Sequence, residues 1–444
     1  TMTQSTRMSD ASFSMDDVVA NRVRDEDSAG HDWYRFILSY PPHLVREYLT
    51  RFKANKKTVV LDPFCGTGTT IVECKKNGIP SIGIEASRFA AFAASVKTDW
   101  TIDPDDLIER SARIAERVRS RLSSQGLRDG RVLPLFDDAR ISSENLRTLP
   151  AETEKLLIKN SISPLPLHNT LVLLEAIMED DSCASRNHPR LAIAQSLVSG
   201  ISNLYFGPAV GVRKPKPDAP VLSIWQNQIA AIASDAQSLR ALAGVKSTVV
   251  HSDARHTKDA LGRQKVDIVI TSPPYPNEKD YTRTTRLESV LLGFINTKEE
   301  LRQQKKSLLR SNTRGVYISD DDDIGIDDAE VNSICDAIEA RRIQLGKTSG
   351  FERMYARVTK LYFGGMKRHL VSLSDSLKPG AKLAYVVGDQ ASYLQIMIRT
   401  GQILSRIAET VGYRSLGIDL FRKRIATATG QELREEVVLL EWQG

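Results

Sequence analysis

The sequence contains few cysteines and no long apolar run. Its cysteines form no Cys-x-x-Cys pair and have no histidine-rich companion segment. This argues against a disulfide framework and a zinc site, so we expect no bound metal, and it fits a reducing cytoplasm. The apolar runs are far shorter than the ~18 residues that a transmembrane helix requires, so we expect no membrane span. The N-terminus lacks an apolar stretch after a basic start, and no secretory signal is expected. The four cysteines are Cys65, Cys74, Cys183 and Cys335.

The charge balance is only mildly one-sided. Lysine and arginine total 61 against 55 acidic residues, and the formal net charge of +6 favours a polyanionic partner over an acidic metabolite. With 444 residues, the chain is long enough for two or three domains, or for one large α/β domain with a substantial insertion.

Short, β-branched apolar stretches recur along the chain and predict buried parallel strands. Helical patterns separate the first five of them, which is typical of a doubly wound sheet. We therefore expect an α/β fold with a seven-stranded, Rossmann-like sheet and a functional site at the carboxyl ends of its strands. The predicted strands are residues 58–61, 81–84, 247–251, 266–270, 382–387, 415–421 and 436–441.

The alternation of strands and helices pauses between the second and third strands. Residues 101–245 are predicted to form a mainly helical insertion, whose first helix has Asp103 placed as N-cap and Pro104 in its first turn. Residues 1–30 have little periodic apolar content, and we expect a poorly ordered arm there. Helices are predicted over residues 43–49, 104–122, 171–178, 191–204 and 221–242.

The first predicted strand runs directly into a Gly-x-Gly turn that is followed by a helix. Glycine at Gly66 and Gly68 lets backbone N–H groups approach a ligand, and the helix N-terminus behind them favours negative charge. Glu85 stands 17 residues after Gly68, at the end of the next strand, where a carboxylate can accept hydrogen bonds from both hydroxyls of a ribose. The third glycine of the dinucleotide fingerprint is missing, which argues against NAD or FAD and for a smaller adenosine-type ligand. The alternative is a tight turn that binds nothing.

A second motif, Ser-Pro-Pro-Tyr at residues 272–275, follows the strongly apolar fourth strand. Its two prolines lock the backbone and leave carbonyl groups that no strand pairing consumes. The side chain of Ser272 and the carbonyl of Pro273 can accept hydrogen bonds from a planar amine while the ring of Tyr275 stacks on it. A proline-rich strand exit with a packed tyrosine is the alternative.

Together the two motifs resemble motifs I and IV of the S-adenosylmethionine-dependent DNA amino-methyltransferases. The resemblance covers roughly residues 31–100 and 246–444, the whole predicted sheet. Residues 34–49 resemble motif X in position and in their Pro-Pro-x-Leu character. The fold that this resemblance implies is a seven-stranded methyltransferase sheet with a large, mainly helical insertion.

The resemblance also implies S-adenosylmethionine as the cofactor. The glycine-rich turn would surround its methionine part, Glu85 its ribose, and Asp253 with Ala254 its adenine. The cofactor-binding residues expected on this basis are Asp62, Phe64, Cys65, Gly66, Thr67, Gly68, Thr69, Glu85, Ala86, Asp253 and Ala254.

The tetrapeptide begins with Ser rather than Asp or Asn, which resembles the cytosine-N4 branch more than the adenine-N6 branch. We therefore expect a site-specific enzyme that flips a cytosine out of double-stranded DNA and methylates its exocyclic amine. Positioning supplies most of the catalysis in such a direct transfer, and no nucleophilic cysteine is required. The expected catalytic residues are Ser272, Pro273, Pro274 and Tyr275.

Four other functions stay open at this point. They are an adenine-N6 DNA methyltransferase, an RNA guanine-N2 methyltransferase, a protein-glutamine methyltransferase, and a DNA-binding regulator that keeps the fold without turnover. The intact Gly-x-Gly turn, Glu85 and the Ser-Pro-Pro-Tyr motif argue against the last of these.

Two basic segments are candidate contacts with DNA phosphates. Residues 213–217 fit either a solvated loop or such a contact. Residues 302–314 carry five cations and no acid, and four aspartates follow at 320–323. We expect residues 301–330 to form a mobile loop with its basic part against DNA and its acidic run turned outward. The candidate DNA-binding residues are Arg302, Lys305, Lys306, Arg310, Arg314, Arg213, Lys214 and Lys216.

The chain is thus expected to consist of an arm, a divided catalytic domain and two regions that are candidates for DNA recognition. A cognate restriction endonuclease is a candidate partner, and the cytoplasm of a bacterial or archaeal cell is the expected location. The expected divisions are 1–30 (arm), 31–100, 246–295 and 351–444 (catalytic), 101–245 (helical insertion) and 296–350 (charged region).

Overall fold

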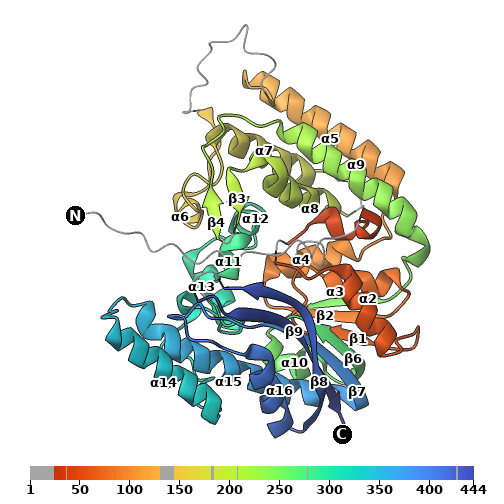
Figure 1. Cartoon of the computed structure of the whole chain (residues 1–444). Coiled ribbons are helices and arrows are strands. Elements are labelled where there is room, and N and C mark those ends of the chain that lie inside the picture. Colours follow the sequence, from red (N-terminus) through yellow and green to blue (C-terminus); the bar gives the residue numbers. More distant parts are fainter. Residues whose placement is uncertain are drawn as a thin grey trace.

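The computed structural model describes residues 25–36, 38–130, 145–181, 185–207, 209–277, 279–426 and 429–444. At its centre lies a seven-stranded sheet in the order β5-β2-β1-β6-β7-β9-β8 (Figure 1). The strands from β5 to β7 run parallel, and β9 is antiparallel to both β7 and β8. The predicted seven-stranded, Rossmann-like α/β fold with a helical insertion is confirmed. The strands are β1 (Val60–Asp62), β2 (Ser81–Glu85), β5 (Ser247–His251), β6 (Val266–Thr271), β7 (Leu377–Gly388), β8 (Tyr413–Ile425) and β9 (Glu432–Trp442).

Helices cover both faces of the sheet. They are α2 (Pro42–Arg51), α3 (Thr69–Lys76), α4 (Arg88–Lys97), α10 (Thr257–Leu261), α14 (Ala329–Gln344), α15 (Tyr355–Ser374) and α16 (Thr400–Thr410). Side chains of a strand alternate between its two faces. In β7, Leu383, Tyr385 and Val387 pack into the core shared with α14, α15 and α16. The intervening Ala384 and Val386 pack into the core shared with α2, so the sheet is doubly wound.

The insertion is a group of helices that Figure 1 shows above the sheet, with α5 and α9 side by side. As predicted, Asp103 caps α5 and Pro104 opens it. None of the helices in the described part of the chain is long and apolar enough to cross a membrane. The helices of the insertion are α5 (Pro104–Ser124), α6 (Ala151–Glu154), α7 (Pro164–Met178), α8 (Asn187–Ser196), the π-helical turn η4 (Leu197–Ile201), α9 (Val221–Leu239) and the 3₁₀ turn η5 (Arg240–Leu242).

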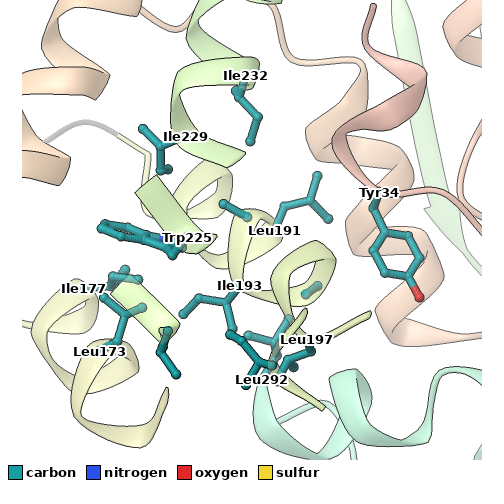
Figure 2. Packing of buried hydrophobic residues seen from close by; sticks show 14 of the residues in the cluster. Tyr34, Leu173, Ile177, Leu191, Ile193, Leu197, Trp225, Ile229, Ile232 and Leu292 are labelled. Carbon is teal, nitrogen blue, oxygen red and sulfur yellow. The ribbon is translucent and has the colours of Figure 1, made fainter. Parts of the chain in front are cut away.

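The insertion and the sheet domain share one hydrophobic core. Trp225 of α9 is fully buried, and Figure 2 shows it close to Ile177 of α7. The same cluster extends to Tyr34 and Phe89, which lie outside the insertion. The insertion is therefore packed onto the sheet domain through a continuous apolar contact.

The predicted helix 191–204 is wrong at its C-terminal end. Helical structure stops at Ile201, and a hairpin of β3 (Leu204–Phe206) and β4 (Val210–Val212) follows. The run Leu204-Tyr205-Phe206 is short and rich in β-forming aromatics, which the helical spacing before it concealed. Gly211 lies opposite Tyr205, and a Cβ there would meet the end of the tyrosine ring, which is exposed and would have to turn aside.

The predicted arm 1–30 is wrong for residues 25–30, while residues 1–24 lie outside the described part of the chain. Asp27 is buried and pairs with Arg46 of α2 at 2.8 Å. The ammonium group of Lys76 donates hydrogen bonds to the carbonyls of Asp27 and Ala29. In a segment with little periodic apolar content, single polar residues give no sign of these partners, which come from α2 and α3.

The predicted mobile loop at 301–330 is also wrong. The first residues of this segment belong to helix α13 (Lys298–Ser307), which Thr297 caps. Buried ion pairs hold the residues that follow the helix. Arg310 is buried and pairs with Asp320 at 2.7 Å, while Asp322 pairs with Arg255 at 2.6 Å. These aspartates therefore face inward, and the acidic run neutralises cations of the protein itself. The shorter helices before α13 are α11 (Tyr281–Thr284) and α12 (Arg286–Leu291).

Candidate active site

Both sequence motifs line one cavity of about 740 Å³ at the carboxyl ends of β1, β2 and β6. The structure thus brings together two motifs that lie about two hundred residues apart in the sequence. Three predicted cofactor residues, Asp62, Gly68 and Asp253, are not part of the cavity wall. The predicted residues that do line it are Phe64, Cys65, Gly66, Thr67, Thr69, Glu85, Ala86, Ala254, Ser272, Pro273, Pro274 and Tyr275.

The two glycines of the turn have different surroundings, although both have a positive φ. A Cβ on Gly66 (φ +52°) would meet no atom within 4 Å, so this backbone borders the open space of the cavity. A Cβ on Gly68 (φ +100°) would lie 3.1 Å from the Cβ of Ala94 in α4. Gly66 therefore allows a ligand to approach the backbone, whereas Gly68 allows the turn to pack on α4.

Glu85 is fixed at the end of β2 by backbone donors. Its carboxylate accepts hydrogen bonds from the N–H groups of Gly66 at 2.8 Å and Ser87 at 3.0 Å. Burial raises the pKa of this carboxyl. Because each carboxylate oxygen can accept more than one hydrogen bond and Glu85 lines the cavity, it can also accept from hydroxyls of a ligand.

Asp62 connects three segments beneath the cavity. Its carboxylate accepts hydrogen bonds from the hydroxyls of Tyr40 at 2.9 Å and Thr271 at 2.5 Å, and from the N–H group of Phe64 at 3.1 Å. Burial raises its pKa to about 6. Asp62 therefore positions the glycine-rich turn against β6 from below.

The side chains of Cys65 and Asp253 contact neighbouring residues of the protein. The thiol of Cys65 lies over Gly83, where a Cβ would come within 2.7 Å of the sulfur, and burial raises the pKa of this thiol. The carboxylate of Asp253 is bound by the guanidinium of Arg255 at 2.7 Å. It also caps the 3₁₀ turn η6 (Ala254–His256), which brings Ala254 to the cavity wall. Adenine contact by the Asp253 side chain, as predicted, would compete with this ion pair.

The Ser-Pro-Pro-Tyr motif presents acceptor groups at the end of β6. The hydroxyl of Ser272 donates its hydrogen to the Val386 carbonyl at 3.0 Å and also interacts with the Tyr275 hydroxyl, and a hydroxyl oxygen has two lone pairs, so one is left to accept from a ligand. No hydrogen bond among the described residues reaches the carbonyl of Pro273. Tyr275 packs against Gly388, where a Cβ would lie 3.1 Å from the ring, and burial raises the pKa of its hydroxyl.

The candidate DNA-binding residues divide into paired and exposed groups. Arg310 is buried in its ion pair with Asp320, and Lys305 pairs with Asp280 at 3.3 Å, so neither faces solvent freely. Lys306 is half-buried beside the ring of Tyr317. The exposed candidates are Arg302 and Arg314, and, directly after β4, Arg213, Lys214 and Lys216.

The hairpin β3–β4 forms part of the cavity wall. Phe206 and Gly207 line the same cavity as Tyr281 and Thr282 of α11. Figure 1 shows the hairpin at the side of the insertion that faces α11 and α12. The insertion therefore reaches the site from the side opposite the sheet.

Sequence reasoning missed several residues of the cavity wall. Tyr40 directly precedes Pro41 and Pro42, so its place in the motif X segment was the signal for it. Lys279 follows the second motif by four residues, but nothing in its spacing marks it as a cavity residue. The missed residues include Tyr40, Lys279, Arg422, Arg424 and Glu435. Among the described residues, no group of three or more His, Cys, Asp or Glu side chains could hold a metal ion.

The sheet order, with both motifs at its carboxyl edge, defines a seven-stranded, Rossmann-like fold of the methyltransferase type. Residues 18–94 match the family model described as DNA methylase. The chain is 24% identical over 433 residues to the type II methyltransferase M.BsoBI of Geobacillus stearothermophilus, covering 90% of this chain and 82% of that one. It is 22% identical over 403 residues to the type II methyltransferase M.AvaI of Nostoc sp., covering 86% and 78%.

The chain also resembles the solved rRNA methyltransferase AviRa from Streptomyces viridochromogenes. The TM-score is 0.35 at 10% identity, over 95% of this chain and 94% of that one, and this likeness adds nothing to the assignment. The sequence similarities and the family match support a DNA amino-methyltransferase.

Proposed function

We propose that the protein transfers a methyl group from S-adenosylmethionine to the N4 amine of a cytosine that is flipped out of double-stranded DNA. The observation that carries this proposal is the placement of the Ser272 acceptor in the same cavity as Gly66 and Glu85. A base amine inside a duplex cannot reach a cofactor at the end of the sheet, so the base must leave the stack.

The cavity fits the cofactor at its glycine-rich end. Gly66 offers backbone without a side chain in the way, and Glu85 offers a fixed carboxylate for two ribose hydroxyls. When bound there, the cofactor supplies an electrophilic methyl group on a sulfonium. Thr67 and Ala86 complete this end of the wall, and Asp62 holds the turn in place.

The protein's own groups orient the amine. Ser272 Oγ, its hydrogen engaged by Val386, and the carbonyl of Pro273 would each accept one N–H of the base. These bonds direct the nitrogen lone pair toward the methyl group, and Tyr275 supplies a face for the base to stack on. In the transfer, the amine nitrogen would take the methyl group that the bound cofactor supplies and would release one proton to solvent.

The test is to incubate the protein with labelled S-adenosylmethionine and unmethylated bacterial DNA, with tRNA and a protein mixture in parallel. The DNA is then digested to nucleosides and separated. We expect label in N4-methylcytosine alone. Label in N6-methyladenine would show the cytosine assignment to be wrong, and label in RNA or protein but not in DNA would overturn the proposed function.

The expected setting is restriction and modification, with a cognate endonuclease as partner. It rests on the similarity to two type II methyltransferases. Host DNA modified by this protein should then resist cleavage by that endonuclease, while DNA from a strain without the gene should be cut.

A further inference from the structure

The cavity continues past the Ser-Pro-Pro-Tyr motif to a strongly basic wall. Lys279, Arg422 and Arg424 line this part of it, together with the carboxylate of Glu435. Asp280, next to Lys279, also lines the cavity, but its carboxylate pairs with Lys305. Glu435 is buried, and both of its oxygens are engaged by the guanidinium of Arg422. The acid therefore compensates one of the three cations and leaves the other two with an excess of positive charge.

The basic wall follows from the two-residue period of β8. Arg422 and Arg424 are two residues apart, so both point to the cavity face, and Lys423 between them points away. Lys423 is half exposed and pairs with Glu432 of β9. Two arginines on one face of the strand thus meet Lys279, which arrives from the segment after the motif.

Lys279 and Arg424 are short of partners. Neither forms an ion pair with another residue in the described part of the chain. The Nε of Arg424 is buried without a hydrogen-bond acceptor. Burial lowers the pKa of Lys279, and the charges of Arg424 and Arg422 lower it further. Cations that are partly desolvated and held near one another are stabilised by an anion, and buried donors need an acceptor.

The wall lies beside the place where the base would be held. The charge of Glu435 acts on both Tyr275 and Lys279. Its side chain also lies next to Gly388, on which the Tyr275 ring packs. A phosphate is joined to its base through a single sugar, so a base stacked on Tyr275 brings its own phosphates to this side of the cavity.

We propose that Lys279 and Arg424 bind a backbone phosphate of the flipped nucleotide and so fix its sugar while Ser272 and Tyr275 hold its base. This inference rests on the proposed function. It differs from the sequence-based expectation, because neither residue belongs to the basic segments 213–217 or 302–314. Arg422 is already paired with Glu435, and this pair holds the basic wall in place.

The experiment compares DNA binding of the wild type, Lys279→Met, Arg424→Met and the double variant across salt concentrations. The probe is a labelled duplex that carries the DNA sequence methylated by the protein. This sequence is mapped beforehand in modified host DNA. We expect the double variant to bind about tenfold more weakly near physiological salt and its slope of log affinity against log salt to fall by about 1. Lys423→Met, a cation on the opposite face of the same strand, is the matched control and should leave the slope unchanged.

A neutral methylphosphonate at the target nucleotide locates the contact. The methylphosphonate should weaken DNA binding by the wild type by the same factor as the double substitution does. It should cause no further loss of binding in the double variant. Equal slopes for the wild type and the folded double variant, or additive losses from the methylphosphonate and the substitutions, would overturn the inference.

The proposed function is judged separately in the same samples. If the wild type binds S-adenosylmethionine but methylates no DNA, the proposed function fails. If the wild type methylates DNA and the double variant keeps the wild-type slope, only the phosphate contact fails. Calorimetry with S-adenosylmethionine should give the same affinity for every variant, because Gly66 and Glu85 belong to the ends of β1 and β2, whereas Arg424 lies on β8 at the far edge of the sheet and Lys279 follows β6.

Discussion

At the scale of single residues, Ser272 and Tyr275 of the Ser-Pro-Pro-Tyr motif contact different neighbours. Ser272 donates to the Val386 carbonyl, while Tyr275 rests on Gly388. Neither contact involves Gly66 or Glu85. Substitutions in the motif should therefore change turnover or base binding without changing cofactor affinity.

Ser272→Ala removes one acceptor for the reacting amine. We expect turnover to fall about tenfold, since a hydrogen bond of this kind contributes on the order of 1 kcal/mol, with unchanged S-adenosylmethionine affinity by calorimetry. Ser272→Asp supplies the acceptor found in the adenine branch and should keep some activity, with a shift toward adenine. Duplexes that contain cytosine or adenine as the only methylatable base distinguish the two cases. Wild-type turnover in Ser272→Ala would remove the acceptor role.

Substitutions of Tyr275 test whether its ring stacks on the base. Tyr275→Phe keeps the aromatic face and should retain most activity, whereas Tyr275→Ala should lose stacking worth roughly 1–3 kcal/mol in the binding of the base. The loss should appear in the KM for DNA and in kcat, measured with saturating cofactor. Full activity of Tyr275→Ala would exclude a stacked, flipped base at this ring.

The two glycines of the turn form a matched pair. Valine at either position must adopt a positive φ, which costs about 1 kcal/mol or more, but only at Gly68 does it also collide with Ala94. We expect Gly66→Val to stay folded and lose cofactor binding, and Gly68→Val to lower the free energy of unfolding more strongly. Urea denaturation and calorimetry on both variants decide this. Equal stability of the two variants would contradict the packing role of Gly68.

At the scale of elements, a buried carboxyl links α12 to the segment before α2. Glu288 is fully buried, accepts a hydrogen bond from the Tyr34 hydroxyl at 3.1 Å, and has a pKa raised to about 8 by burial. The unfolded chain loses this proton near pH 4.5 and the folded chain only near pH 8. Between these values the folded state binds the extra proton, so stability falls as pH rises.

Glu288→Gln cannot ionise and should abolish this fall. Relative to the wild type, the variant should gain roughly 3 kcal/mol between pH 5.5 and pH 8.5 in urea denaturation. Glu409→Gln, at an exposed position of α16, is the control and should show no such gain. A pH-independent difference between Glu288→Gln and the wild type would contradict a neutral Glu288.

Elements with a strong period or motif could be predicted from the sequence, whereas those that depend on distant partners could not. The strands of the sheet and the cap at Asp103 follow from local pattern, and the two motifs meet because parallel strands end at one edge. The segment 302–314 contains no acidic residue, so the sequence predicts that its cations are unpaired. Its partner Asp320 approaches Arg310 only in the folded chain. Lys279 and Arg424 were missed for the same reason, because a distant hairpin brings them together.

At the scale of the whole molecule, the continuous core makes the insertion and the sheet one unit. The cluster that surrounds Trp225 in the insertion extends to Phe89 of α4 and to Tyr34, two residues before the cavity residue Phe36. The insertion also contributes Phe206 to the cavity wall. Loosening the insertion should therefore disturb the site, even though no predicted cofactor residue lies in it.

Trp225→Ala tests this coupling. Trp225 is fully buried, and its indole N–H donates to the carbonyl of Pro189 at 3.0 Å. We expect the variant to lose about 3–5 kcal/mol of unfolding free energy, and Trp225→Phe to lose less because most of the ring volume is kept. Both should unfold in one transition that is the same by circular dichroism and by loss of S-adenosylmethionine binding, since the shared core leaves no boundary at which the insertion could separate. Asn227→Ala, exposed on the same helix, should match the wild type. If the insertion unfolds first while cofactor binding persists, the two parts are separate folding units.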